Sequence, residues 1–130
     1  MDLIADTSLI VAIEREARRK IDGSAHRFLE THANDRFFIT FTVSGELACG
    51  DSASVETDWR ALCEPYGMIA WSPAVSLAYG RIYRALKTQG ALIGTNDIWI
   101  AATAVAHGLP VVTGNGAEFN RVSGLTVLEF

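Results

Sequence analysis

Short apolar runs alternate with longer segments of helical periodicity along the whole chain. Five runs predict strands, at residues 3–5, 37–40, 68–70, 110–113 and 126–128. These runs lack the alternation of apolar and polar residues that a half-exposed strand shows, so we expect both of their faces to be covered. Buried strands separated by helices are typical of an α/β domain with a parallel sheet.

Helix start and stop signals occupy the segments between the predicted strands. Ser72 followed by Pro73 predicts the first turn of a helix that Gly90 ends, and Gly108 ends a helix over residues 96–107. Further helices are expected at residues 7–15 and 23–33, from about residue 42, and through residues 59–62 with Asp51, Ser52 or Ser54 as N-cap. The order βα(α)βααβααβαβ predicts a three-layer α/β/α sandwich around a five-stranded parallel sheet, with right-handed crossovers.

Composition narrows the class of protein. A chain of 130 residues with 49% hydrophobic and 20% charged residues is expected to form one globular domain over residues 1–130. No apolar run approaches the ~20 residues that cross a bilayer, and no basic leader opens the chain, so we expect a soluble cytoplasmic protein without a membrane partner. Cys49 and Cys63 are too few for a disulfide framework or a zinc finger and are expected to be structural thiols.

Three acidic residues fall at or shortly after the carboxyl ends of predicted strands, where α/β sheets bind their ligands. Asp6 follows the first strand directly, Glu46 lies early in the helix after the second, and Asp97 begins the helix over residues 96–107. Taken singly, Asp6 and Asp97 fit helix capping better than catalysis. Glu46 fits capping less well, because a glutamate among apolar neighbours is rare without a partner.

Three carboxylates at one sheet edge would repel one another unless a proton or a cation lies between them. An all-oxygen cluster suits Mg²⁺ or Mn²⁺. A bound cation would also bring positive charge to a chain whose net charge is −4, which otherwise argues against a simple basic nucleic-acid binder. The three acids therefore predict a divalent-metal site, and the net charge does not exclude an enzyme that uses such a cation to handle phosphates.

The segment after the fourth predicted strand, residues 113–119, adds an amide and a carboxylate at the same edge. Its Gly114-Asn115-Gly116 run is not a dinucleotide fingerprint, because Phe119 replaces the third glycine and too few residues follow for the rest of such a unit. A small-molecule phosphatase with a D-x-D nucleophile is also disfavoured, since Ser8 occupies the second acidic position after Asp6.

Four segments, in order along nearly the whole chain, resemble the motifs of PIN domains of the VapC type, the toxic ribonucleases of bacterial and archaeal toxin–antitoxin pairs. They are residues 4–8, 43–47, 96–102 and 112–125. The resemblance implies a parallel sheet that holds Mg²⁺, with Mn²⁺ as an alternative, and endonucleolytic cleavage of RNA to leave a 5′-phosphate and a 3′-hydroxyl. It also implies a cognate antitoxin that brings a basic side chain to the acids. A two-fold homodimer is expected as the commonest closed symmetry.

Carried over by position, the resemblance makes Asp6, Glu46 and Asp97 the catalytic, metal-binding acids. Asp6 and Asp97 would bind the metal directly, and Glu46 would be a ligand or would orient the attacking water. Asn115 stands where many PIN domains have a fourth acid, so the number of metal ions, one or two, stays open. Glu118 would assist through water. Accessory positions are Asn115, Glu118, Thr7 and Thr113.

Other residues allow further interpretations. Arg15, Arg18 and Arg19 are candidates for contact with RNA phosphates if the connecting loop folds back toward Asp6. Packing within helices or at a dimer interface is favoured over base stacking for the three tryptophans, and structural or surface roles are expected for the three histidines. A PIN fold that only binds or assembles, without catalysis, is an alternative that rests on Asn115 alone.

Overall fold

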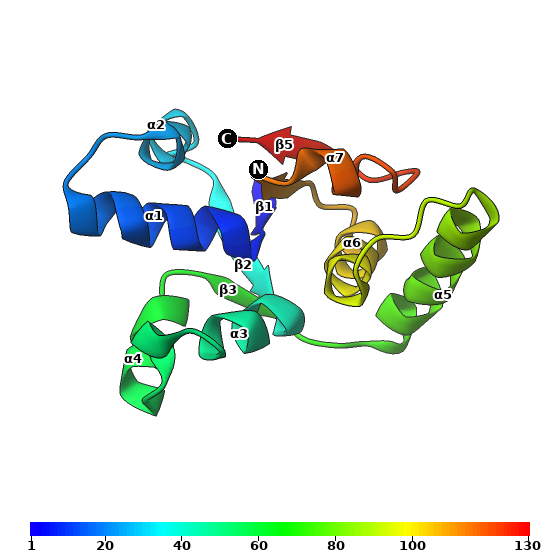
Figure 1. Ribbon diagram of the computed structural model, residues 1–130, viewed down its shortest axis with the longest axis horizontal. Helices are drawn as coiled ribbons and strands as arrows, with labels where there is room; N and C mark the ends of the chain where they lie inside the picture. Colours follow the sequence, from blue (N-terminus) through cyan, green and yellow to red (C-terminus); the bar gives the residue numbers. More distant parts are fainter.

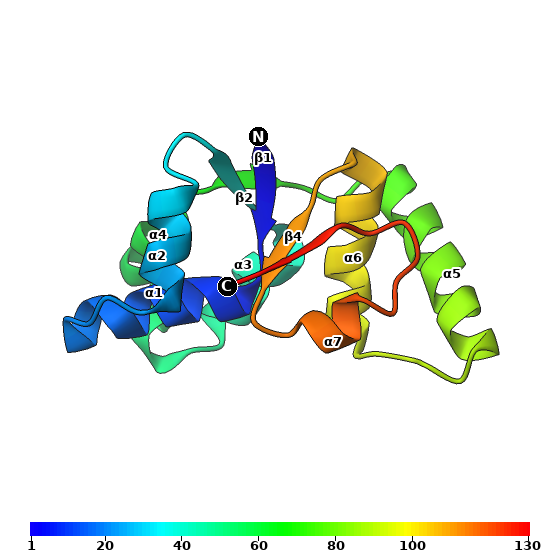
Figure 2. The same ribbon diagram turned by 90° about the horizontal axis from the view of Figure 1, so that it is seen from above.

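Five parallel strands form the centre of the molecule, and helices cover both faces of the sheet (Figures 1 and 2). The computed structural model describes all of residues 1–130. The strands are β1 (Asp2–Ala5), β2 (Arg36–Thr40), β3 (Gly67–Ile69), β4 (Val111–Thr113) and β5 (Val127–Glu129). Their spatial order is β3-β2-β1-β4-β5, and every neighbouring pair is parallel. The predicted α/β/α sandwich is confirmed.

The helices divide between the two faces of the sheet. They are α1 (Thr7–Arg19), α2 (Ser24–Thr31), α3 (Phe41–Ala48), the 3-10 turn η1 (Asp51–Ala53), α4 (Glu56–Cys63), α5 (Pro73–Thr88), α6 (Thr95–His107) and α7 (Gly116–Phe119). Figure 2 shows α1, α2 and α4 on one side of the strands, with α5 and α6 packed together on the other. None of these helices is long and apolar enough to cross a membrane.

Burial of the central strands explains their continuous apolar sequence. Leu3, Ile4 and Ala5 of β1 have no exposed surface, and neither do Val111 and Val112 of β4. Each of these strands has a neighbour on both edges, while helices cover both of its faces. The core therefore lies on both sides of β1 and β4. Its packing fixes the positions of the carboxyl ends of these two strands.

Most predicted helix boundaries agree with the structure, and two are wrong. The helix expected at residues 7–15 continues to Arg19. Ser72 is the N-cap of α5, and Gly108 ends α6 in the left-handed conformation at φ 66°. The helix expected from Asp51, Ser52 or Ser54 begins instead at Glu56, because residues 51–53 form a separate turn. Tertiary contacts determine this start, since Ala53 is buried in the turn and the Trp59 indole donates to the Ser44 carbonyl of α3 at 2.9 Å.

The chain changes direction across the sheet between β1 and β4. From β1 it moves outward to β2 and β3, and it then crosses to the opposite side to add β4 and β5. Such a topological switch point opens a crevice at the carboxyl ends of the strands on either side of it. The segments that leave β1, β2 and β4 therefore meet at one edge of the sheet.

A buried carboxylate that the sequence analysis did not single out joins α1 to α2. Glu16 of α1 is 4% exposed and accepts hydrogen bonds from the backbone N–H groups of Ala25 (3.1 Å) and His26 (3.0 Å) and pairs with His26 Nδ1 (2.8 Å). Burial raises the pKa of Glu16, but the His26 and Ala25 hydrogen bonds outweigh it and lower the pKa to about 2. Glu16 thus caps the first turn of α2 and is structural.

Candidate active site

Asp6, the first residue after β1, is held by two hydroxyl groups. Its carboxylate makes no cap hydrogen bond with the N-terminus of α1, so the capping interpretation of this side chain is wrong. Instead Thr113 Oγ1 donates to Asp6 Oδ2 at 2.8 Å, and Ser8 Oγ donates to the same oxygen at 2.9 Å. Asp6 is 6% exposed. The side chain is therefore fixed at the switch point between β1 and β4.

Glu46 faces the same edge from α3. The Thr40 hydroxyl at the end of β2 accepts a hydrogen bond from the Val43 N–H at 3.2 Å and so starts this helix. Glu46 lies one turn further on, between the buried side chains of Val43 and Leu47, and Thr7 Oγ1 donates to its Oε1 at 2.8 Å. The first turn of α1 therefore orients an acid of α3.

Asp97 occupies the first turn of α6, and its pKa is raised from 3.8 to about 7. Burial is the largest cause, followed by a hydrogen bond with Glu118 and by the negative charges of Asp6, Glu118 and Glu46. A carboxylate that served mainly as a helix cap would be stabilised in its ionised form, which would lower the pKa. The shift therefore places Asp97 within a cluster of like charges that includes the other two predicted acids.

The segment that leaves β4 completes this edge. Asn115 Nδ2 donates to Glu118 Oε2 at 3.2 Å, and the Asn115 N–H donates to Thr113 Oγ1 at 2.9 Å. Glu118 also raises the pKa of Asp97, so α7 brings a further carboxylate close to the acid of α6. The seven predicted core and accessory residues thus form two hydrogen-bonded sets, and the pKa of Asp97 is raised by the charges of both. The sets are Thr7 with Glu46, and Asp6 with Thr113, Asn115 and Glu118.

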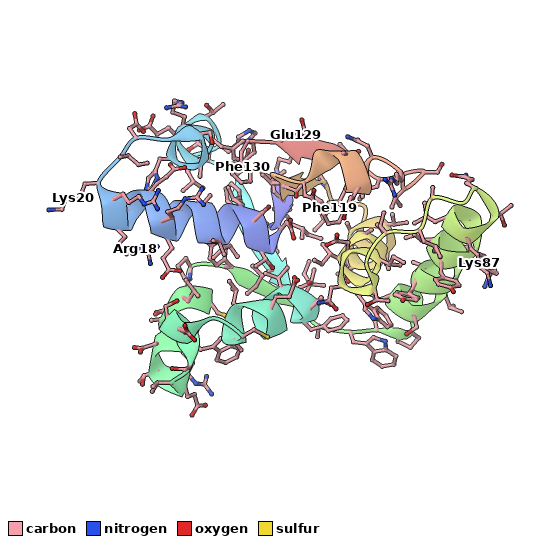
Figure 3. All side chains as sticks on the ribbon, viewed as in Figure 1. Arg18, Lys20, Lys87, Phe119, Glu129 and Phe130 are labelled. Carbon is pink, nitrogen blue, oxygen red and sulfur yellow. The ribbon has the colours of Figure 1, made fainter.

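The arginines proposed for RNA contact lie elsewhere. Helix α1 runs without a break from Thr7 to Arg19, so the chain does not fold back toward Asp6. At 1.5 Å per residue, Arg15, Arg18 and Arg19 lie about 12–18 Å along the helix from Thr7. Figure 3 shows Arg18 and Lys20 at the end of α1 that is distant from Phe119 and the site.

The donor set fits a hard divalent cation. Every candidate ligand is an oxygen atom, and a cation would relieve the repulsion that raises the pKa of Asp97. No three His, Cys, Asp or Glu side chains are grouped closely enough to hold a metal ion between them. Mg²⁺ binds through one or two carboxylates and keeps several waters, so it does not require such a group.

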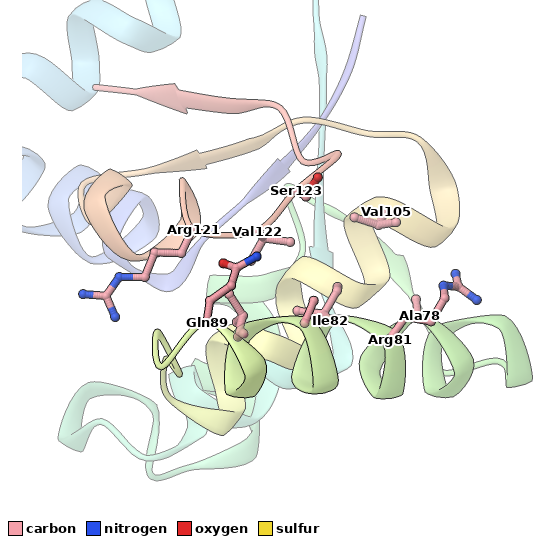
Figure 4. A pocket seen from close by; sticks show the side chains of 10 residues that line it. Ala78, Arg81, Ile82, Gln89, Val105, Arg121, Val122 and Ser123 are labelled. Carbon is pink, nitrogen blue, oxygen red and sulfur yellow. The ribbon is translucent and has the colours of Figure 1, made fainter.

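The three cavities of the molecule lie away from the candidate acids. A cavity of about 210 Å³ lies between α5 and the segment after α7, lined by residues such as Ile82 and Val122 (Figure 4). Larger hollows of about 680 and 480 Å³ adjoin Tyr66. None of the candidate acids lines any of them.

Two of the three tryptophans pack inside the protein. Trp99 packs against Tyr79 in a tilted arrangement with ring centroids 4.2 Å apart and meets Phe41 edge to face at 5.9 Å, and Trp59 packs against the core. Trp71 is 55% exposed and hydrogen-bonds Ser76, so its packing role is not met within the chain. His26 and His32 pair with Glu16 and Asp35, while His107 is exposed. Both cysteines are free thiols, and Cys49 is exposed rather than packed.

Residues 3–125 match the sequence profile of the PIN domain. The match spans β1 through the segment before β5 and includes every acid of the site. The chain therefore belongs to the PIN-domain family.

Its relatives within that family are of the VapC type. It is 32% identical to Ribonuclease VapC1 of Haemophilus influenzae (strain R2866), over 96% of this chain and 95% of the relative. It is also 32% identical to Ribonuclease VapC1 of Rickettsia felis, over 98% and 96%. The solved structure of VapBC-1 from nontypeable Haemophilus influenzae matches with a TM-score of 0.79 and 29% identity, over 99% of this chain and 98% of that one. VapBC2 of Rickettsia felis, bound to a promoter DNA fragment, shares the fold with a TM-score of 0.80 and 24% identity, over 100% and 99%.

Proposed function

We propose that this protein is a divalent-metal-dependent endoribonuclease and the toxin of a VapBC-type toxin–antitoxin pair. The observation that carries the proposal is the convergence of Asp6, Glu46 and Asp97 at the switch point of the sheet, each with a defined electrostatic or hydrogen-bonding partner. Relatives named Ribonuclease VapC1 that are 32% identical over nearly the full length support the RNA-cleaving activity.

Asp6 and Asp97 would hold Mg²⁺, or Mn²⁺ in its place, and Glu46 would be a third ligand or the group that orients the attacking water. When bound, the cation lowers the pKa of its water and offsets charge on the phosphate. Thr7 holds the Glu46 carboxylate in one orientation, at 2.8 Å. Asp97 must lose the proton that its neighbours favour before it can bind a cation. We expect products with a 5′-phosphate and a 3′-hydroxyl.

Asn115 distinguishes this site from PIN domains with four acids. Its amide orients Glu118, which lies beside Asp97, so a fourth carboxylate is still present in the site. This arrangement favours the nuclease over the non-catalytic binding module, whose only support was the missing acid at position 115.

RNA cleavage by the purified protein, with Mg²⁺ or with EDTA, tests the activity. Asp6→Asn and Asp97→Asn should each lower the cleavage rate at least about 100-fold with the fold intact, since each removes a charged ligand. Asp58 is the matched control, because it is exposed and occupies in α4 the same third helical position that Asp97 occupies in α6. Asp58→Asn should cleave at the wild-type rate. Equal cleavage by all four proteins would refute the proposed site.

The proposed partner is a small antitoxin, and the structures named VapBC support its existence. The clustered carboxylates suit an arginine, whose guanidinium can satisfy two carboxylate oxygens at once. Joint replacement of Asp6 and Asp97 by asparagine should therefore weaken capture of the product of an adjacent small gene. Growth arrest that no neighbouring gene relieves would refute the toxin–antitoxin assignment and leave the nuclease standing.

We also propose that the protein forms a homodimer. Helix α5 exposes two large apolar side chains, Leu77 at 67% and Tyr83 at 36%, which a second copy would cover. Sedimentation should give a dimer mass, and a monomer at micromolar concentration would refute this proposal.

A further inference from the structure

Two hydroxyl groups converge on a single oxygen of the Asp6 carboxylate. Ser8 Oγ lies 2.9 Å and Thr113 Oγ1 lies 2.8 Å from Oδ2, and the two hydroxyl oxygens are 3.4 Å apart. Ser8 lies in the first turn of α1, two residues after Asp6, whereas Thr113 ends β4, 107 residues along the chain. The contact is therefore built from both sides of the switch point.

The direction of these hydrogen bonds follows from the backbone. Ser8 Oγ accepts from the Gly114 N–H at 3.0 Å, and Thr113 Oγ1 accepts from the Asn115 N–H at 2.9 Å. A hydroxyl has one proton to donate, and a carboxylate oxygen is a stronger acceptor than a second hydroxyl. Both hydroxyl protons therefore point to Asp6 Oδ2, and two amide–hydroxyl–carboxylate chains run side by side.

The other carboxylate oxygen is free. No group of the protein donates to Asp6 Oδ1, although Oδ2 receives two hydrogen bonds. Oδ1 retains some contact with solvent, because the only fully buried side-chain oxygen or nitrogen without a partner is Thr42 Oγ1. The two oxygens of one carboxylate thus have separate environments, since Oδ2 is hydrogen-bonded within the protein and Oδ1 has no protein donor.

We propose that Ser8 is a positioning residue that, together with Thr113, occupies Asp6 Oδ2 and so reserves Oδ1 for a divalent cation. This inference rests on the proposed metal-dependent function. Ser8 has a second effect, since its bond with the Gly114 N–H ties the loop that carries Asn115 and Glu118 to the end of β1. The neighbouring Thr7 serves a different acid, Glu46, so the two hydroxyls are not interchangeable.

Mn²⁺ binding by calorimetry, measured without RNA, tests this role. Ser8→Ala and Thr113→Val should each weaken Mn²⁺ affinity roughly 10- to 100-fold, as expected when a group that orients a metal ligand is lost. Ser8→Thr keeps the hydroxyl and should retain most of the affinity. Thr103→Val is the matched control, because Thr103 is as buried as Thr113 but donates to a backbone carbonyl of α6. It should bind Mn²⁺ like the wild type.

A double-mutant cycle separates positioning from general damage. In an Asp6→Asn background, Ser8→Ala should cause no further loss of Mn²⁺ affinity, because the residue it acts through is already changed. If the wild type binds Mn²⁺ and cleaves RNA while Ser8→Ala and Thr113→Val bind equally well, this inference is overturned and the proposed function stands. Equal weakening by Thr103→Val, or an additive effect with Asp6→Asn, would also overturn it. A wild type that neither binds Mn²⁺ nor cleaves RNA would overturn both.

Discussion

Replacing Asp97 by asparagine should stabilise the metal-free protein while it removes the activity. In the folded state the pKa of Asp97 is raised from 3.8 to about 7 by burial, by Glu118 and by the surrounding charges. The unfolded chain releases this proton near pH 4, whereas the folded protein keeps it until about pH 7. The folded state is therefore progressively disfavoured as the pH rises from 4 to 7, and above pH 7 the full cost of the ionised carboxylate is present.

The magnitude follows from the size of this shift. A rise from 3.8 to about 7 corresponds to an upper bound of about 4 kcal/mol, at 1.36 kcal/mol per pH unit. Asp97 is only partly buried, so solvent screening reduces the effect to about 2 kcal/mol. Asparagine also loses a favourable interaction with the N-terminus of α6, worth about 0.5 kcal/mol. The expected net gain is about 1–2 kcal/mol at pH 8 and less than about 1 kcal/mol at pH 5, where the folded wild type is protonated.

Urea denaturation in EDTA at pH 5 and pH 8 measures this difference, and Asp58→Asn again provides the control. Asp58 is exposed in the first turn of α4, so its replacement should destabilise slightly and equally at both pH values. An Asp97→Asn protein that is less stable than the wild type at pH 8, or that gains the same stability at both pH values, would show that the cluster is not under electrostatic strain.

Three further predictions concern the metal, the fourth carboxylate of the site and the α1–α2 connection. Mg²⁺ or Mn²⁺ at 100 times its dissociation constant should stabilise the wild type by about 2.7 kcal/mol, and thermal melting of Asp6→Asn should show little of this gain. Glu118→Gln should lower the RNA cleavage rate less than Glu46→Gln, and the reverse order in steady-state kinetics would contradict the assignment of Glu118 as an accessory residue. Gly23→Ala should destabilise by about 1–3 kcal/mol in urea, because its methyl group would lie 2.5 Å from the Glu16 carboxyl carbon; a wild-type midpoint would contradict this.

Local sequence signals predicted most of the strands and helices, because these elements form where the local signals favour them. The apolar runs of β1 and β4 are continuous since both strands are covered on both faces, and the Ser72-Pro73 pair and Gly108 mark helix ends through their own backbone preferences. The start of α4 was mispredicted, because the burial of Ala53 and the bond from Trp59 to α3 depend on residues that are neighbours only after folding. The secondary-structure propensity of a local segment carries no information about such contacts.

The site residues likewise fall into those that local sequence position predicted and those that depend on contacts formed only after folding. Position after a strand was enough to select Asp6 and Glu46, because parallel strands bring their carboxyl ends to one edge. Asp97 lies in the first turn of α6, which follows α5 rather than a strand, so the expectation that it lies shortly after a strand is wrong, and the resemblance to PIN domains was the better signal for it. Ser8 was noted only as the residue that rules out a second acid, and its bonds to Asp6 and Gly114 require β1 and β4 to be neighbours. Glu16 was missed because its partners lie in the next helix. Its position on the buried face of α1 was the one sequence signal that could have identified Glu16.

The bond from Thr113 to Asp6 joins residues separated by 107 positions, and it has a consequence for the order of folding events. A folding intermediate in which β1, β2 and β3 have paired would contain Asp6 and Glu46 but would lack the hydroxyl that completes the environment of Asp6. Contacts between residues so distant in sequence form slowly, because the intervening chain must be ordered first. Recovery of RNA cleavage during refolding should therefore coincide with the slowest kinetic phase, so that activity reports on the last step of folding rather than on early collapse.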